Sequence, residues 1–215
     1  MAPLIELFEA HGQKTSFSAY TYEGMDFEIV VAGVGAVKTA FSMSQLKSMG
    51  NIDLAIQVGL AGAYDRRLSL GDVIIVGSDQ FGDVGVEEQN GDFTSVNELG
   101  LEDENQFPFT QGKLETELKF YPKSIKVVDG ITVNTVSGTA TTIARRLAKY
   151  SPQTESMEGA AFYYACKILD IPCFQLRAIS NYVEPRNRDN WDIANAISNL
   201  KTEFFSILPL LSHYR

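Results

Sequence analysis

Thr154-Glu155-Ser156-Met157-Glu158-Gly159-Ala160-Ala161 and Arg177-Ala178-Ile179-Ser180-Asn181 are the two stretches that decide the fold of this chain. The small residues after Glu158 are typical of the start of a helix, which we predict over 156–169. The Ser180-Asn181 pair follows an apolar run, which predicts a buried strand over 173–179. Because ligands collect at the carboxyl ends of strands in an α/β sheet, we expect both stretches to border one site.

Strands and helices alternate along the rest of the chain. The region 82–124 lacks sustained periodicity and is expected to form loops with short strands. This order predicts an α/β protein, a single three-layer αβα domain over residues 1–215 around a central twisted mixed sheet that is largely parallel. The other predicted strands are 27–34, 53–58, 72–77 and 131–136, and the other predicted helices are 4–11, 37–49, 142–149 and 189–208.

The composition argues against several classes of function. The chain has 215 residues, 45% of them hydrophobic, and a formal net charge of −9 without any run of Lys and Arg. Since sequence-independent binding of nucleic acid needs a basic patch, we expect no nucleic-acid partner. The apolar runs are shorter than the roughly 20 residues that span a bilayer. No signal peptide opens the chain, so we expect a cytoplasmic protein without a membrane partner.

Metal binding is also disfavoured by the residues available. Cys166 and Cys173 lie on a predicted helix and the next strand, where they are expected to be small core residues. His11 and His213 stand near the chain ends, so a set of clustered ligands is lacking. We therefore expect no metal, no cofactor and a reducing compartment.

Small or polar residues stand at three predicted strand ends, over 33–35, 59–62 and 137–139. Glycine there either lets the backbone approach a ligand or simply ends a strand. The first of these loops is not a dinucleotide fingerprint, because Lys38 stands where the third glycine is required. A phosphate-binding Gly-Lys-Ser/Thr loop is absent from the sequence.

Two charged residues have both a structural and a functional interpretation. Glu158 either faces the dipole of the predicted helix or accepts hydrogen bonds from two neighbouring sugar hydroxyls. Arg177 inside a strand is a buried charge that needs a partner, either Glu158 or Glu155. Asn181 has an amide that suits a heterocycle, so Glu158 and Asn181 together suggest a nucleoside site.

Arg186 and Arg188 stand in the predicted loop 182–188. They either form a solvated basic loop or clamp a carboxylate, because guanidinium matches that group with two hydrogen bonds.

The motifs resemble the hydrolase branch of the nucleoside phosphorylase/hydrolase superfamily. That branch contains the methylthioadenosine/adenosylhomocysteine nucleosidases and their sister family, the futalosine hydrolases. Residues 180–183, residues 185–188 and Trp191 are more similar to futalosine hydrolases, which release hypoxanthine in an alternative menaquinone pathway. The resemblance rests on Val58-Gly59-Leu60-Ala61-Gly62, Leu70-Gly71-Asp72-Val73-Ile74, Val136-Ser137-Gly138-Thr139, Glu155-Ser156-Met157-Glu158-Gly159-Ala160 and Arg177-Ala178-Ile179-Ser180-Asn181.

The resemblance implies roles for particular residues and a purine nucleoside as the small-molecule partner. It assigns catalysis to Asn181 and Glu158. It also implies a homodimer in which a loop closes the neighbouring site, for which the apolar tip 106–109 is the candidate, with local packing as the alternative. The substrate-binding residues that it implies are Met157, Ser180, Gly59, Leu60, Ala61, Ser137, Gly138, Thr141, Arg177, Arg186 and Arg188.

Three aligned positions distinguish the branches of this superfamily. Phosphorylases hold phosphate with an Arg and a Ser, where this chain has Gln57 and Leu60, so water is favoured as the nucleophile. Adenine-cleaving relatives have Asp where Asn181 stands. An amide can donate to nitrogen 7 and oxygen 6 of a 6-oxopurine, so Asn181 favours hypoxanthine over adenine. Hydrolysis of methylthioadenosine or adenosylhomocysteine, phosphorolysis and binding without catalysis remain alternatives.

The start of the chain departs from the family pattern. Family members begin with a strand and a loop whose carboxylate activates the attacking water, whereas here Met1 directly precedes the predicted helix 4–11. We therefore expect the domain to lack the first strand of the family, with an unpaired strand in the sheet and weakened hydrolysis.

Overall fold

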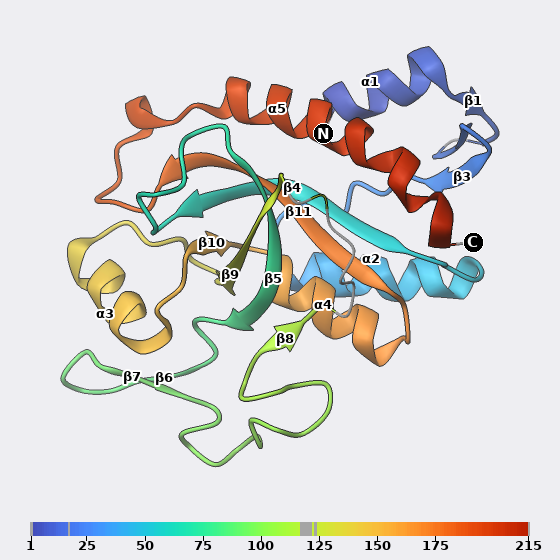
Figure 1. Ribbon diagram of the computed structural model, residues 1–215. Coiled ribbons are helices and arrows are strands. Elements are labelled where there is room, and N and C mark those ends of the chain that lie inside the picture. Colours follow the sequence, from blue (N-terminus) through green and yellow to red (C-terminus); the bar gives the residue numbers. More distant parts are fainter. Residues whose placement is uncertain (1, 17, 117–121, 123, 215) are drawn as a thin grey trace.

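A six-stranded mixed sheet forms the centre of the molecule (Figure 1). The computed structural model describes residues 2–16, 18–116, 122 and 124–214. The strands are β4 (Ala55–Ala63), β5 (Val73–Phe81), β8 (Leu114–Glu115), β9 (Lys126–Thr132), β10 (Thr154–Ser156) and β11 (Cys173–Tyr182). They follow the order β11-β4-β10-β9-β5-β8, and β11 also pairs with β5. The twisted sheet therefore closes on itself, and β8 extends it along β5.

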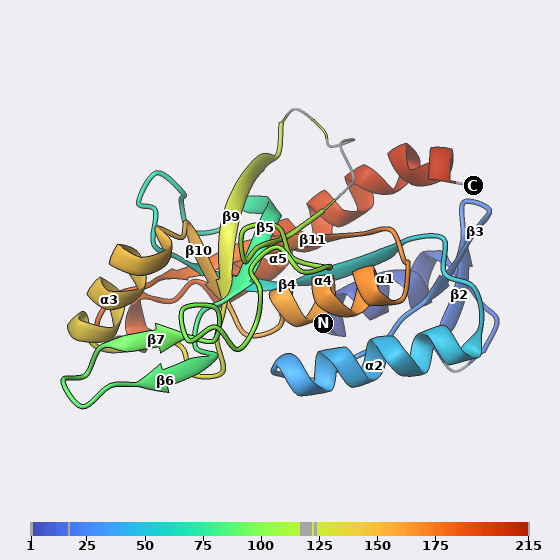
Figure 2. The same cartoon turned by 90° about the horizontal axis from the view of Figure 1, so that it is seen from below.

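Helices cover both faces of this sheet, as Figures 1 and 2 show. On one face α5 (Ile193–Ile207) packs against β11, and α1 (Ala2–His11) packs against α5. On the other face α4 (Gly159–Ile168) contacts the strands and α2 (Ala36–Met49) packs on α4. The predicted three-layer α/β domain is thus confirmed. Within the described part of the chain, no helix has the length and apolar character needed to cross a bilayer.

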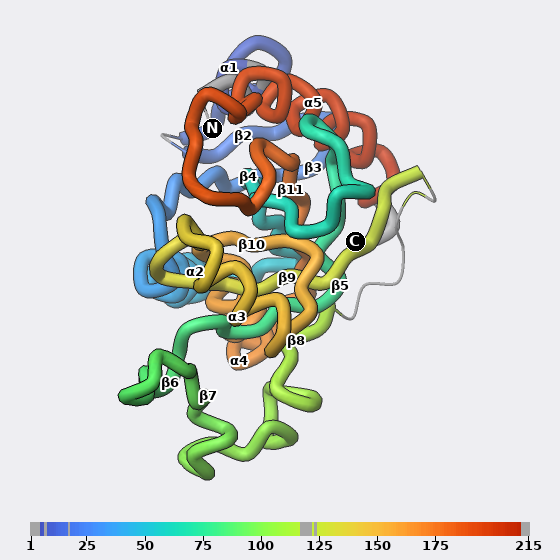
Figure 3. Tube along the Cα trace, turned by 90° about the vertical axis from the view of Figure 1, so that its left-hand side faces the viewer, coloured from blue at the N-terminus to red at the C-terminus, as the bar shows by residue number. Residues whose placement is uncertain are grey.

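Smaller elements surround this core. The antiparallel strands β1 (Gln13–Lys14), β2 (Ala19–Tyr22) and β3 (Met25–Glu28) form a separate sheet near α1. The hairpin of β6 (Gly85–Glu87) and β7 (Phe93–Ser95) projects away from the central sheet (Figure 3). Helix α3 (Ala140–Tyr150) lies at one end of the molecule (Figure 1), and the short 3-10 helices η1 (Arg188–Asn190) and η2 (Leu208–Tyr214) flank α5.

The largest core cluster lies between the sheet and helices α1 and α5. Phe8 is central to it, with ring centroids 5.0 Å from Phe27 and 5.3 Å from Phe205. The second cluster lies under α2 and α4, and contains Cys166 and Cys173 as buried free thiols, as predicted for core residues. Burying these apolar faces positions the strand ends at which the site forms.

All five predicted strands have other bounds in the structure, and β5 and β11 extend beyond the predicted 72–77 and 173–179. β9 begins before the predicted 131–136 and ends at Thr132, because the Asp83 carboxylate accepts the backbone N–H of Asn134 and so replaces a strand partner. β4 runs through the glycines at 59 and 62, because β11 pairs with it as far as Ala63. Of the predicted 27–34 only residues up to Glu28 are in a strand, since the Ile29 N–H still donates to the Ser18 carbonyl oxygen but no described strand pairs with 30–34.

The region 82–124 contains loops and the short strands β6, β7 and β8, as predicted, although 117–121 and 123 lie outside the described residues. The predicted helix 156–169 begins only at Gly159, because Thr154–Ser156 form β10 between β4 and β9. The predicted helix 189–208 is divided into η1, α5 and the start of η2. The expectation of a missing strand before the first helix concerns a part of the chain outside the described residues.

Candidate functional site

A small pocket opens where β11 and β4 end and β10 begins, next to the loops after β9 and β11. Asn181 is the register partner of Gly62 in β4, and Gly62 is in turn the partner of Glu155 in β10. The register of β11 against β4 shifts between Ile179 and Asn181. Such a bulge re-aims the side chain that follows it. Asn181 lies inside β11, whereas the sequence predicted that it follows the end of the strand. Six of the residues that line the pocket are Gly62, Ser137, Glu155, Asn181, Arg186 and Trp191.

The amide of Asn181 has a defined orientation. The hydroxyl of buried Ser180 donates to Asn181 Oδ1 at 2.8 Å, and Asn181 Nδ2 donates to the carbonyl oxygen of Tyr182 at 3.0 Å. Because a carbonyl oxygen only accepts hydrogen bonds, the nitrogen must be the atom on that side. Nδ2 carries a second N–H, which has no protein partner among the described residues and lies at the pocket wall.

Glu158 stands just before α4, but its carboxylate does not cap the helix. Its Oε1 accepts the backbone N–H of Gly35 at 3.1 Å, and its Oε2 lies 3.4 Å from Arg177 Nη1. The side chain remains 20% exposed, so further acceptor positions are open to a ligand. These contacts disfavour the interpretation of Glu158 as a simple dipole partner, and they bring the glycine loop 33–35 beside Glu158, which is not among the residues that line the pocket.

Arg177 is a buried cation held by four acceptors. Besides Glu158, they are the carbonyl oxygen of Leu60 at 3.0 Å, Gln57 Oε1 at 2.6 Å and Gln175 Oε1 at 3.0 Å. Of the two expected partners, Glu158 is therefore the correct one. A Cβ atom at Gly59 would come within 3.0 Å of the guanidinium, so glycine there lets Arg177 lie across β4.

Behind this arginine lies Asp79, which the sequence analysis did not select. Its carboxylate accepts hydrogen bonds from Thr132 Oγ1 at 3.0 Å and Gln175 Nε2 at 3.2 Å. A Cβ atom at Gly159 would lie only 2.0 Å from Asp79 Oδ2, so this glycine allows α4 to begin against the buried carboxylate. Nothing in the local sequence marks Asp79, since it lies in an apolar strand far from the other residues of the network.

Asp79 makes the stability of the protein depend on pH. Burial raises the pKa of Asp79 from 3.8 to about 6, against the opposing effect of Arg177. The folded state thus binds the proton more tightly than the unfolded state, so Asp79 favours folding below pH 4 and that stabilisation is lost as the pH rises through 6. At 1.36 kcal/mol per pKa unit the loss is on the order of 3 kcal/mol.

Asp79→Asn removes this titration. We expect the free energy of unfolding of the wild type, relative to the variant, to fall between pH 4 and pH 7 in urea denaturation. A difference between the two proteins that does not change with pH would contradict this account of Asp79.

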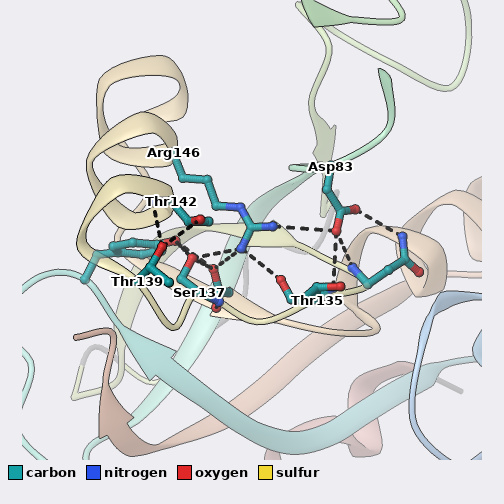
Figure 4. A network of polar contacts seen from close by, with 9 residues as sticks. Asp83, Thr135, Ser137, Thr139, Thr142 and Arg146 are labelled. Carbon is teal, nitrogen blue, oxygen red and sulfur yellow. Dashed lines mark hydrogen bonds and ion pairs between the residues drawn. The ribbon is translucent and has the colours of Figure 1, made fainter. Parts of the chain in front are cut away.

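A second buried network lies under the loop 134–139, as Figure 4 shows for the labelled residues. Arg146 on α3 donates to Ser137 Oγ at 2.8 Å, to the carbonyl oxygen of Thr135 at 2.9 Å and to Glu155 Oε2 at 3.0 Å. Tyr64 also donates to Glu155 Oε2, at 2.7 Å. Desolvation, followed by the Glu155 charge, raises the pKa of Tyr64 well above its usual value, so this phenol stays neutral.

Sequence reasoning missed Tyr64 and Arg146. Tyr64 is distant along the chain from the motif that contains Glu155, and Arg146, which is close to it in sequence, is one of two adjacent arginines on a helix. The network therefore arises from the fold, which brings α3 and the end of β4 next to Glu155 in β10.

The remaining predicted site residues do not all line the pocket. Close to the site lie Leu60 and Ala61 in β4, half-buried Met157 between β10 and α4, and Gly138, whose carbonyl oxygen accepts the Arg186 N–H at 3.2 Å. Thr141 is exposed in the first turn of α3 and does not line the pocket. Arg186 and Arg188 lie over the ring of Trp191, at 5.4 and 5.8 Å from its centroid.

Comparison with known proteins places this architecture in a family. The family model described as the phosphorylase superfamily matches residues 2–206. The chain belongs to the phosphorylase superfamily. Within this superfamily, the futalosine hydrolase of Thermus thermophilus is 30% identical over 203 residues, covering 93% of this chain and 87% of that protein. The resemblance seen in the motifs is thus confirmed.

Solved structures of superfamily members share the fold. The futalosine hydrolase of Helicobacter pylori superposes with a TM-score of 0.72 at 15% identity, covering 95% of this chain and 89% of the other. The 5'-methylthioadenosine/S-adenosylhomocysteine nucleosidase of Neisseria meningitidis, in complex with methylthio-immucillin-A, gives 0.76 at 19% identity and covers 98% and 96%. At these identities the likeness establishes the fold and leaves the substrate to the geometry of the site.

Proposed function

We propose that this protein is an N-glycosyl hydrolase that cleaves futalosine into hypoxanthine and dehypoxanthine futalosine, a step of menaquinone biosynthesis. The orientation of Asn181 carries this proposal, because Ser180 and the Tyr182 carbonyl leave one N–H of this pocket residue without a described protein partner. A 6-oxopurine offers only acceptors, nitrogen 7 and oxygen 6, on the edge that such a donor would meet. The futalosine hydrolase of Thermus thermophilus supports the same substrate.

In this mechanism the glycosidic bond breaks through a sugar with oxocarbenium character. Glu158 accepts hydrogen bonds from the ribose hydroxyls, and its negative charge stabilises the developing cation. Half-buried Met157 lines the sugar. Asn181 donates to the departing base, so that the charge left on the base is better tolerated. Because an amide cannot act as a general acid, the proton comes from solvent or the base leaves as an anion.

Water is favoured over phosphate as the nucleophile, because Arg177, the cation beside Gly59, already has protein hydrogen-bond partners. Arg177 is bound by Gln57, Gln175, Glu158 and a carbonyl oxygen. A dianion would also meet the carboxylate of Glu158 there. The test is base release from futalosine with and without inorganic phosphate.

The proposal predicts free dehypoxanthine futalosine at a rate that phosphate does not change. Phosphate-dependent formation of a sugar 1-phosphate would identify a phosphorylase. Tight binding of futalosine without base release would identify a binding protein.

Arg186 is proposed to bind the benzoate carboxylate of futalosine. It lines the pocket with Asn181 and is stacked on Trp191, so its guanidinium is pre-oriented. We expect Arg186→Gln to raise KM for futalosine about 10-fold, the effect of one solvent-exposed charge-assisted hydrogen bond, and to leave KM for inosine, which lacks the carboxylate, unchanged. Arg67→Gln, which removes another exposed arginine, one paired with Asp65, is the matched control. Equal effects of Arg186→Gln on both substrates would contradict the assignment.

A cytoplasmic homodimer is also proposed. Exposed apolar side chains gather around the start of α2, where Val34, Val37 and Phe41 are all more than 60% exposed. Phe107 is exposed in the loop 106–109, whereas Phe109 packs locally on Tyr164. Contiguous exposed apolar surface marks an interaction site.

We expect sedimentation equilibrium to show that the wild type is a dimer. The double substitution Val37→Asp and Phe41→Asp should dissociate this dimer. A monomeric wild type would contradict the proposal.

A further inference from the structure

Buried polar side chains connect Asp79 in β5 with Glu158, the residue that is proposed to bind the sugar. Gln175 Nε2 donates to Asp79 Oδ2 at 3.2 Å, and Arg177 Nε donates to Gln175 Oε1 at 3.0 Å. Arg177 Nη1 in turn lies 3.4 Å from Glu158 Oε2. Asp79, Gln175 and Arg177 are each at most 1% exposed. A change at Asp79 can therefore reach Glu158 through protein groups that are shielded from water.

The chemistry of the groups fixes the direction of these hydrogen bonds. A guanidinium only donates, so the carbonyl oxygen of Gln175 must face Arg177 and its NH₂ group must face Asp79. Asp79 also accepts from Thr132 Oγ1 at 3.0 Å, while the Thr132 oxygen accepts the Ala160 N–H at 2.7 Å. Both side-chain partners of Asp79 thus present a donor to it, which suits an ionised carboxylate.

Arg177 is held back from Glu158 by its other acceptors. Its Nη2 lies 2.6 Å from Gln57 Oε1, and its Nη1 also donates to the Leu60 carbonyl oxygen at 3.0 Å. The distance from Nη1 to Glu158 Oε2 is 3.4 Å, whereas a charge-assisted hydrogen bond to a carboxylate is about 2.7–2.9 Å long. The ion pair is therefore loose, and Arg177 only weakly offsets the negative charge of Glu158.

The charge of Asp79 balances Arg177 from the side opposite to Glu158. Burial raises the pKa of Asp79 to about 6, whereas the positive charge of Arg177 lowers it, so the two charges interact. With all three groups ionised, one net negative charge remains for Glu158 to present. In the described part of the chain, the elements packed around Asp79 otherwise direct uncharged groups at it, which are Gln175 from β11, Thr132 and Gly130 from β9, Leu114 from β8 and Gly159 from α4.

We propose that Asp79 is a positioning residue for the reaction, which through Gln175 holds Arg177 away from Glu158 so that Glu158 keeps its negative charge for the sugar. The proposal rests on the function proposed above, because that charge stabilises the oxocarbenium-like sugar. Asp79 itself does not line the pocket. When Asp79 is neutral, Arg177 pairs more closely with Glu158, and cleavage of the glycosidic bond slows.

Asp79→Asn tests this role through kcat for base release, compared with the wild type at pH 8 and pH 5. At pH 8 the variant should be about 10-fold slower, a typical effect between members of one hydrogen-bond network. Because the pKa of Asp79 is about 6, the wild type is about nine-tenths protonated there at pH 5, and the ratio should fall to about 2. KM should not change, since the contacts of Asn181 lie outside the network.

An exchange of the two side chains distinguishes lost charge from lost structure. In the double variant Asp79→Asn with Gln175→Glu, the amide and the carboxylate change places, and the carboxylate accepts directly from Arg177 Nε. This variant should recover most of the kcat that the single substitution loses at pH 8. Asp53→Asn removes a carboxylate at an exposed position before β4 and should match the wild type at both pH values. Thermal unfolding checks that each variant is folded.

The outcomes separate this proposal from the proposed function. Base release from futalosine with a kcat ratio that is the same at both pH values would remove the role of Asp79 alone. Release from methylthioadenosine alone would contradict the proposed substrate, and the ratio would then be measured with that nucleoside. Release from neither nucleoside by the wild type would overturn both proposals. If Asp79→Asn did not fold, a folded double variant that stayed slow at pH 8 would still overturn the role of Asp79, and a fast one would support it.

Discussion

Replacing Glu158 with Gln is expected to lower kcat for base release by about 100- to 1,000-fold, the range for removing one preorganised electrostatic group. The amide keeps the shape of the side chain but removes the negative charge beside the developing oxocarbenium ion. Arg177 keeps its bonds to Gln57, Gln175 and the Leu60 carbonyl oxygen, so the fold should persist. Steady-state kinetics with futalosine measure the effect, and thermal unfolding checks that the variant is folded.

Glu87→Gln provides the control for Glu158→Gln. It makes the same change of charge on the exposed strand β6 and should leave kcat unchanged. If Glu158→Gln were as active as this control, Glu158 would have no part in stabilising the transition state.

Asn181→Asp is expected to lower kcat/KM for futalosine by about 100-fold, because a site that loses a matched hydrogen-bond group discriminates strongly. In the folded protein the new oxygen would face the carbonyl oxygen of Tyr182, where the amide now donates at 3.0 Å. A carboxyl oxygen at that position can accept from the 6-amino group of adenine, but it offers no N–H to oxygen 6 of a 6-oxopurine. The variant should therefore gain activity on methylthioadenosine relative to the wild type.

The ratio of kcat/KM values for futalosine and methylthioadenosine is the quantity to measure for Asn181→Asp. Asn51→Asp, an exposed change before β4, should leave that ratio unaltered. Unchanged selectivity in Asn181→Asp would refute the role of Asn181 in reading the base.

The sequence predicted the layers of this fold because apolar runs mark the buried strands and glycines mark helix ends, as Gly50 does after α2. Helix α2 begins one residue before the predicted 37–49, and Arg177 lies beside Glu158 as expected for a buried charge. β10 was missed because its residues, Thr154–Ser156, are few and polar, and they become a strand only through their neighbours β4 and β9.

The candidate site was predictable only in part, for a similar reason. Glu158, Ser180 and Asn181 stand in motifs that carry a chemical signal of their own. Tyr64 meets Glu155 through long-range packing, which leaves no local pattern in the chain, and nothing in the sequence distinguishes Arg146 from the adjacent Arg145. Similarly, the strand bulge that aims Asn181 at the pocket depends on the pairing of β11 with β4.

The most direct measurement for the proposed function is a competition between futalosine and methylthioadenosine at equal concentration, with the released bases separated by chromatography. The account predicts hypoxanthine from futalosine and little adenine, because the oriented Asn181 amide donates to a 6-oxopurine. Adenine as the main product would contradict it and would identify the protein as a methylthioadenosine/adenosylhomocysteine nucleosidase.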